Sequence, residues 1–229
     1  MMKMAHIQTF ALLGALALGV PGAAAGQETE RVDRTANIRA GGQLKVKNFS
    51  GTVTITGSRR GDVAIHAVRR ASRERLDNIK LEITETSSGL TIEANKKSDN
   101  WRNENNNVVE TQLDIQVPED VSLDIDVFSS EIRVVDVTGR QRLHTFSGDI
   151  DVTGATGSID AETFSGDIEL TLAQGAGGRV DFDSFSGSLR SDAGMVTRSS
   201  SRRRVTGTIG TGGSNDYHFK TFSGDARIK

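Results

Sequence analysis

The stretch TFSGDI at residues 145–150 decides the fold, because it returns almost unchanged at residues 163–168. Looser copies stand at residues 48–51, 128–130, 184–187 and 221–225. The sequence holds nine phenylalanines, and six of them are followed by serine. Such a regular placement of a scarce residue indicates an internal repeat.

The spacing of the copies predicts the size of the repeating unit. Phe128, Phe146 and Phe164 follow one another at intervals of 18 residues. The next intervals are 21 and 37 residues, and we expect the longer one to hide an eroded copy at residues 205–209. Each 18-residue unit also divides into halves of nine residues, so it has room for two short strands with their turns.

The pattern inside a copy is that of a strand with one buried face. Phe146, Gly148, Ile150 and Val152 alternate with polar residues, and side chains two residues apart lie on the same face of a strand. This pattern predicts that the phenylalanines stack on one another in the interior. It also predicts that the intervening acidic residues lie outside.

These observations predict an all-β fold, a flattened β-solenoid whose coils of about 18 residues contain two short strands each and stack at ~4.8 Å. One coil cannot bury its own apolar face, so stability rises with the number of neighbours. A β-sandwich is the alternative, because short strands at regular spacing also build that fold. The near identity of copies 18 residues apart favours the solenoid.

The chain divides into a leader and one continuous fold. Lys3, an apolar run over residues 7–20 and small residues at 23–25 predict a signal peptide over residues 1–25. The apolar run is shorter than the ~20 residues of a membrane span, although an uncleaved anchor is the alternative reading. We expect a linker at 26–41, an N-terminal β region at 42–127 and the regular repeat region at 128–229.

Composition excludes several functions. The chain has no cysteine, which rules out thiol catalysis, iron–sulfur clusters, Cys-rich zinc sites and attachment of a lipid to cysteine. Its formal net charge is −2, and export from the cytoplasm is predicted, so nucleic acid is not an expected partner. We expect the protein in the periplasm or at the cell surface, without a membrane span once the signal peptide is removed.

Three groups of residues are candidates for binding. Acidic residues that include Asp149 and Asp167 recur at 18-residue spacing; they either cap turns, bind Ca²⁺ through stacked carboxylates, or act as the paired acids of a glycosidase. Trp101 and Arg102 lie in an Asn-rich run that could hold a sugar or cover the coil stack. Arg202, Arg203 and Arg204 form a basic cluster that suits lipid phosphates, a polyanion or plain solvation.

Residues 117–121 (VPEDV), followed by FSSEIRV at 128–134 and the FSGDI copies, resemble a known family. It is the family of secreted bacterial β-strand-repeat proteins of unknown function that are often labelled "putative adhesin". The resemblance covers residues 36–229 and implies a right-handed, β-helix-like or rolled β architecture at the bacterial envelope. The family supplies no catalytic residues to carry over. The run around Trp101 and the cluster at 202–204 depart from its pattern.

The sequence therefore predicts a non-enzymatic, adhesin-like module that binds or scaffolds at the cell envelope. Its expected partners are an envelope polysaccharide or another envelope protein, and no cofactor is expected apart from the Ca²⁺ considered above. Motifs of serine hydrolases, zinc proteases and phosphate loops are absent from the sequence. The alternatives are a polysaccharide-processing enzyme on a β-helix and a purely structural or sensory envelope protein.

Overall fold

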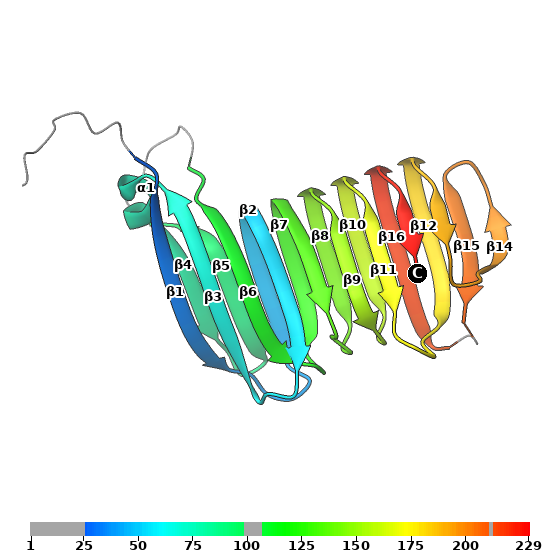
Figure 1. Cartoon of the computed structure of the whole chain (residues 1–229), viewed down its shortest axis with the longest axis horizontal. Coiled ribbons are helices and arrows are strands. Elements are labelled where there is room, and N and C mark those ends of the chain that lie inside the picture. Colours follow the sequence, from blue (N-terminus) through cyan, green and yellow to red (C-terminus); the bar gives the residue numbers. More distant parts are fainter. Residues whose placement is uncertain (1–25, 99–106, 211–212) are drawn as a thin grey trace, which may run out of the picture.

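The structure is a computed structural model that describes residues 26–98, 107–210 and 213–229. The predicted signal peptide at 1–25, together with Trp101 and Arg102, lies outside the described residues. The described chain forms 17 strands and one short helix, α1 (Arg73–Asn78). Figure 1 shows the strands side by side along the long axis, with α1 and β1 at one end and β14 at the other.

The strands form two layers joined by two long, bent strands, β2 (Gln43–Ser58) and β7 (Ser122–Val135), which contribute to both. The other strands of layer A are, in spatial order, β4 (Ile79–Glu85), β5 (Gly89–Lys97), β8 (Gln141–Ser147), β10 (Ile159–Ser165), β16 (Asn215–Ser223), β12 (Gly178–Ser186), β15 (Arg204–Ile209) and β14 (Val196–Ser200). In both layers β2 and β7 are neighbours, and in layer A they lie between β5 and β8.

Layer B is built in the same way from the second strand of each coil. Its other strands are, in spatial order, β1 (Glu28–Asn37), β3 (Asp62–Ala71), β6 (Glu110–Pro118), β9 (Ile150–Ala155), β11 (Ile168–Leu172), β17 (Ala226–Ile228) and β13 (Leu189–Ser191). Here β2 and β7 lie between β6 and β9.

The register of the pairs confirms the 18-residue coil. Ile159 pairs with Gln141 in layer A, and Ile168 pairs with Ile150 in layer B, both in parallel strands. The pairing is antiparallel only toward the two ends, between β1, β3 and β6, between β4 and β5, and between β12, β15 and β14. The parallel stack is that of a flattened β-solenoid, whereas an up-and-down sandwich pairs neighbouring strands antiparallel. The handedness of the coil stays a prediction.

The core lies between the two layers. Leu143 of β8 and Ile150 and Val152 of β9 point into it from one coil, and each is at most 1% exposed. The neighbouring coils repeat these positions, so apolar side chains form continuous rows along the stack. Because each row is covered mainly by the coils above and below, the fold is stabilised as an assembly of coils.

Glycine at the corners of the coils after β8 and β10 is required by the close approach of the neighbouring coil. A Cβ on Gly166 would lie 2.1 Å from the carbonyl oxygen of Gly148. A Cβ on Gly148 would in turn lie 2.2 Å from the carbonyl oxygen of Ser130. No side chain fits at such distances, which explains why the repeat carries Ser-Gly-Asp where it turns between the layers.

Two assignments made from the sequence are wrong. Residues 26–41 are not a linker, because β1 pairs antiparallel with β3 over Glu28–Asn37. This edge strand is mostly exposed and therefore lacks the apolar alternation that marks strands with a buried face. The expected eroded coil at 205–209 is instead β15, an antiparallel strand that caps β12.

The coils also do not stack in chain order throughout. The C-terminal pair β16 and β17 lies between the pair β10 and β11 and the pair β12 and β13, as Figure 1 shows for β16. The expectation that successive coils are neighbours is correct only from β7 to β11. Among the described residues, no helix has the length and apolar character needed to cross a membrane.

Candidate functional site

The repeated phenylalanines form a ladder on the outside of layer A, here called the phenylalanine ridge. Adjacent ring centroids are 4.6–4.9 Å apart and adjacent ring planes differ by at most 15°. Each ring is 41–55% exposed. The ridge consists, in spatial order, of Phe49, Phe128, Phe146, Phe164, Phe222 and Phe185.

The prediction that these rings lie in the interior is wrong. In β8, Leu143 and Thr145 are buried, so the side chains between and after them, His144 and Phe146, point outward. The corner at residues 147–149 then shifts the alternation, and Ile150 is buried again in β9. Strict alternation through the corner would place Phe146 on the same face as Ile150. Because the corner shifts the alternation, the residues before it lie on the face opposite to the predicted one.

Buried threonines fix the backbone beneath the ridge. Thr145 Oγ1 donates a hydrogen bond to the carbonyl of Ser130 at 3.0 Å, and Thr163 Oγ1 donates to the carbonyl of Gly148 at 3.1 Å. Thr221 Oγ1 repeats this contact within its own corner, to the carbonyl of Gly224 at 2.9 Å. Because Phe146, Phe164 and Phe222 each follow such an anchored threonine, the backbone beneath this part of the ridge is fixed before anything binds.

A groove of about 480 Å³ runs beside four of the six rings of the ridge. Four rings line it, from Phe146 to Phe185, and so do polar side chains from the same strands and the Arg203 side chain. Apolar walls with a few charged groups are typical of binding sites. The ring faces contact one another, so a partner in this groove meets ring edges rather than ring faces.

Charged residues form stripes on the outer face of layer A next to the ridge, here called the striped face. At the two outward positions nearest the ridge, each strand carries side chains that are both basic or both acidic; farther from the ridge, Arg179 of β12 faces Asp216 of β16 at 3.7 Å. Basic strands alternate with acidic strands along the stack. The pairs are, in spatial order, Lys45 and Lys47 of β2, Asp124 and Asp126 of β7, Arg142 and His144 of β8, Asp160 and Glu162 of β10, His218 and Lys220 of β16, and Asp181 and Asp183 of β12.

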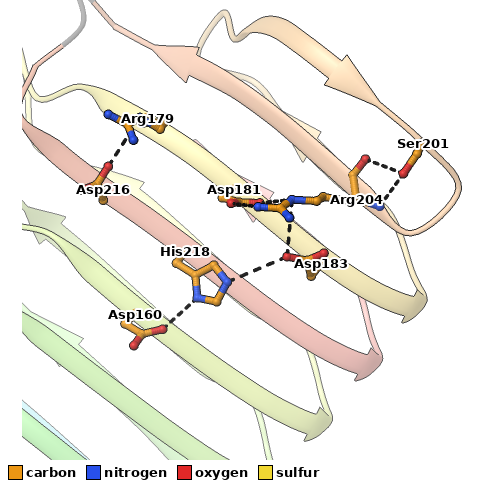
Figure 2. Close-up of polar contacts among 8 residues, drawn as sticks. All are labelled: Asp160, Arg179, Asp181, Asp183, Ser201, Arg204, Asp216 and His218. Carbon is orange, nitrogen blue, oxygen red and sulfur yellow. Dashed lines mark hydrogen bonds and ion pairs between the residues drawn. The ribbon is translucent and has the colours of Figure 1, made fainter.

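Ion pairs connect the stripes across neighbouring strands. Lys45 Nζ lies 3.2 Å from Asp124 Oδ2, and Lys220 Nζ lies 2.5 Å from Glu162 Oε1, a contact that raises the pKa of Lys220. His218 lies between two acidic strands, with Nδ1 2.9 Å from Asp160 and Nε2 4.0 Å from Asp183 (Figure 2). The basic strand β16 therefore separates β10 from β12, whose acidic side chains would repel one another as direct neighbours.

The arginine cluster closes this surface at one end. The Arg203 guanidinium lies 4.6 Å from the ring centroid of Phe185 and covers the last ring of the ridge. Arg204 contacts Asp181 at 2.5 Å and Asp183 at 3.8 Å (Figure 2), and the Asp181 carboxylate raises the pKa of Arg204. Arg202 is exposed. Two of the three arginines predicted as binding residues thus lie at the ridge and the striped face.

The predicted acidic ladder joins the coils at their corners. Asp149 Oδ1 accepts a hydrogen bond from the backbone N–H of Asp167 at 2.8 Å, and Asp167 Oδ1 accepts one from the N–H of Asp225 at 2.8 Å. Asp225 in turn accepts from the N–H and the hydroxyl of Ser188, which lowers the pKa of Asp225. Within the described ranges, no group of three or more His, Cys, Asp or Glu residues is placed to hold a metal ion.

Comparisons with known proteins agree with this architecture. Residues 119–229 match the Toastrack family DUF4097, which confirms the family resemblance of the repeat. A "putative cell adhesion protein" from Clostridium sporogenes has the same fold, with a TM-score of 0.65 at 12% identity over 88% of this chain and 99% of that one. At such low identity the likeness shows the fold and transfers no residue roles.

Two further solved structures cover similar shares of the chain with lower TM-scores. A "putative adhesin" from Bacteroides fragilis has a TM-score of 0.33 at 11% identity over 87% of this chain and 97% of that one. A "putative adhesin" from Parabacteroides distasonis has a TM-score of 0.27 at 8% identity over 90% and 98%. No curated protein matches the chain.

Proposed function

We propose that this chain, whose residues 119–229 match the Toastrack family DUF4097, is a non-enzymatic, adhesin-like module of the cell envelope. It binds a polymer or another protein through the phenylalanine ridge and the adjacent striped face. The observation that carries the proposal is the ridge itself, six stacked and exposed aromatic rings along one side of a rigid stack of coils.

An exposed apolar row of this length favours a binding role. Contiguous apolar patches on a protein surface mark interaction sites more often than scattered apolar residues do. The ridge rings are held by stacking and by the anchored threonines beneath them, so little side-chain freedom is lost when a partner covers them. The stripes next to the ridge supply charges that orient a partner.

The proposal includes export, which the signal peptide predicted at 1–25 supports. The rival proposal is an enzyme that processes polysaccharides. Such an enzyme needs two carboxyl groups ~5–9.5 Å apart on either side of a bound sugar. On the striped face, the carboxylates of β10 and β12 project from one face of a single layer instead of facing each other across a bound sugar, and they contact basic side chains. This arrangement supports binding rather than paired-acid catalysis.

The test is retention of purified residues 26–229 on isolated envelope fractions: peptidoglycan, outer-membrane lipid and extracellular polysaccharide, with an immobilised envelope-protein extract as a fourth fraction. We expect saturable, salt-dependent retention on one of them. The variant Phe146→Ser/Phe164→Ser removes the centre of the ridge and should lower retention at least tenfold. Val196→Ser is the matched control, because Val196 is 68% exposed on β14 and lies outside the ridge.

The comparison is valid only for variants that keep the fold. Melting temperatures close to that of the wild type show that they do. Equal retention of the ridge variant and the control would show that the ridge is not the binding surface. A wild-type chain that is retained on none of the four fractions and does not associate with a second copy of itself would contradict the binding function itself.

A further inference from the structure

We infer that the partner of the ridge and striped face is a second copy of the same chain. The two copies meet face to face with their coil stacks antiparallel, related by a twofold axis that runs along the strands between β8 and β10. This inference rests on the proposed binding function, because it names the partner for the same surface.

The ridge fits its own reversed copy. It contains six rings at nearly constant spacing, so reversing the order of the rings preserves the period. In the antiparallel arrangement Phe49 faces Phe185 of the partner subunit, and Phe146 faces Phe164 of the partner subunit. Every ring of one ridge therefore meets a ring of the other, and the exposed edges are buried together.

The stripes supply the charge complementarity. At the two outward positions nearest the ridge, six strands alternate in sign, beginning with the basic strand β2 and ending with the acidic strand β12. Because six is an even number, reversal places each basic strand opposite an acidic one. Lys47 then faces Asp183 of the partner subunit, and Asp126 faces Lys220 of the partner subunit.

The same pattern opposes the other arrangements. A twofold axis along the coil stack would place each strand opposite its own copy, so that Asp126 would face the partner's Asp126. Sliding the antiparallel copies by one coil would likewise bring strands of the same sign together. Like charges in contact across an interface cost free energy, so the stripes select both the antiparallel direction and the register.

The side chains concerned are available for such contacts. The side chain of Lys220 is 53% exposed and that of Asp126 is 59% exposed, although each has a partner within its own chain. Asp181 and Asp183 are the most engaged, because Arg204 contacts both. We therefore expect the middle of the interface, from β7 to β16, to contribute more than its ends.

The size of the surface indicates a moderate affinity. Six coils at ~4.8 Å and about seven residues per strand at ~3.3 Å give a face of roughly 29 by 23 Å on each copy. That corresponds to the lower part of the range for specific interfaces, about 1,200–2,000 Å² in total. We expect a dissociation constant on the order of micromolar, which requires measurements over a range of concentrations.

The experiment is sedimentation velocity of residues 26–229 from about 1 to 300 µM, a range chosen around that expected constant. We expect a reversible monomer–dimer equilibrium. Asp126→Lys and Lys220→Asp should each weaken dimerisation at least tenfold, because either change places like charges opposite each other at two points of the dimer. An equimolar mixture of the two variants should dimerise again, because in the mixed dimer each substituted strand faces the oppositely substituted one.

Two controls separate this geometry from general effects. Asp151→Lys makes the same charge change on the outer face of layer B and should leave dimerisation unchanged, since Asp151 belongs to β9. Phe146→Ser/Phe164→Ser should weaken dimerisation, and it decides the question if a charge reversal unfolds the chain. If dimerisation is instead restored by mixing Asp126→Lys with the wild type, each strand faces its own copy in the partner subunit. That result would overturn the proposed antiparallel arrangement.

A chain that stays monomeric over the whole concentration range, or variants whose mixture does not recover, would overturn the second copy as partner. Retention on envelope fractions is measured separately with dilute monomer. A monomeric chain that is retained keeps the proposed function and loses only this inference.

Discussion

The imidazole Nδ1 of His218 lies 2.9 Å from the carboxylate of Asp160, although the two residues are 58 positions apart in the chain. The contact joins β16 to β10 and belongs to the same set as the ion pair between Lys220 and Glu162. These pairs favour the place of the C-terminal strand β16 between the two acidic strands β10 and β12.

Reversing the charge of β16 should therefore destabilise the stack. In Lys220→Glu the new carboxylate would lie between Glu162 of β10 and Asp183 of β12. We expect the free energy of unfolding to fall by about 1 kcal/mol, because exposed ion pairs contribute little more than that. Urea denaturation at low and high salt measures it. Lys220→Gln, which removes charge without repulsion, should lose less, and equal losses in both variants would argue against repulsion as the cause.

The sequence was sufficient to predict the coil but not the direction of its side chains. The equal spacing of Phe128, Phe146 and Phe164 predicts 18-residue coils, and the structure confirms them. Alternation alone cannot distinguish a face defined by Phe146 from one defined by Thr145, because both follow a period of two. Only the position of the corner at Gly148 decides which residues point inward, and that corner is a contact between coils.

The order in which the coils stack likewise depends on contacts between their strands and cannot be inferred from the spacing of the phenylalanines along the chain. The distance along the chain from Phe185 to Phe222 suggested a further coil between them, whereas Phe222 lies between Phe164 and Phe185. A signal was present in the charges, since next to the ridge β10 and β12 carry two acidic residues each and β16 carries His218 and Lys220. The candidates Trp101 and Arg102 lie outside the described residues, so their role stays a prediction.

The corner glycines should tolerate no side chain. In Gly166→Ala the added Cβ would meet the carbonyl oxygen of Gly148 at 2.1 Å, which forces the two coils apart. We expect a loss of roughly 2–4 kcal/mol of unfolding free energy, typical of overpacking combined with backbone strain. Thermal and urea denaturation measure it. Gly61→Ala is the control, because nothing lies within 4 Å of its added Cβ; similar losses in both variants would contradict the close-approach argument.

The buried threonines should matter for their hydroxyl groups rather than for their size. Thr163→Val keeps the shape but leaves the carbonyl of Gly148 without the hydrogen bond that Thr163 donates. We expect a loss of about 1–3 kcal/mol, the cost of a buried polar group left without its partner. Thr163→Ser, which keeps the hydroxyl and loses a methyl group, should retain that hydrogen bond. A Thr163→Val variant as stable as the wild type would show that another donor satisfies the carbonyl.

Acid should weaken the junction between β17 and β13 through Asp225. Hydrogen bonds from Ser188 lower the pKa of this carboxyl in the folded state, compared with about 3.9 in an unfolded chain. The group therefore stabilises the fold above its unfolded pKa, and the stabilisation is lost as the pH falls through the folded pKa. Asp225→Asn should be less stable than the wild type at pH 7 and approach it at low pH. Urea midpoints measured from neutral to acidic pH test this, and a constant difference between the two proteins would rule out the linkage.

The acidic ladder should not depend on calcium. The carboxylates of Asp149 and Asp167 already accept backbone hydrogen bonds from the next coil, whereas Ca²⁺ requires six to eight oxygen ligands. We expect millimolar Ca²⁺ to leave the melting temperature of residues 26–229 unchanged within about one degree, with Mg²⁺ as the control for ionic strength, because only an ion bound by the folded state raises it. A rise of several degrees with Ca²⁺ alone would instead assign the ladder to metal binding. In that case Asp167→Asn should abolish the rise, since it removes one of the charges that the ion would need.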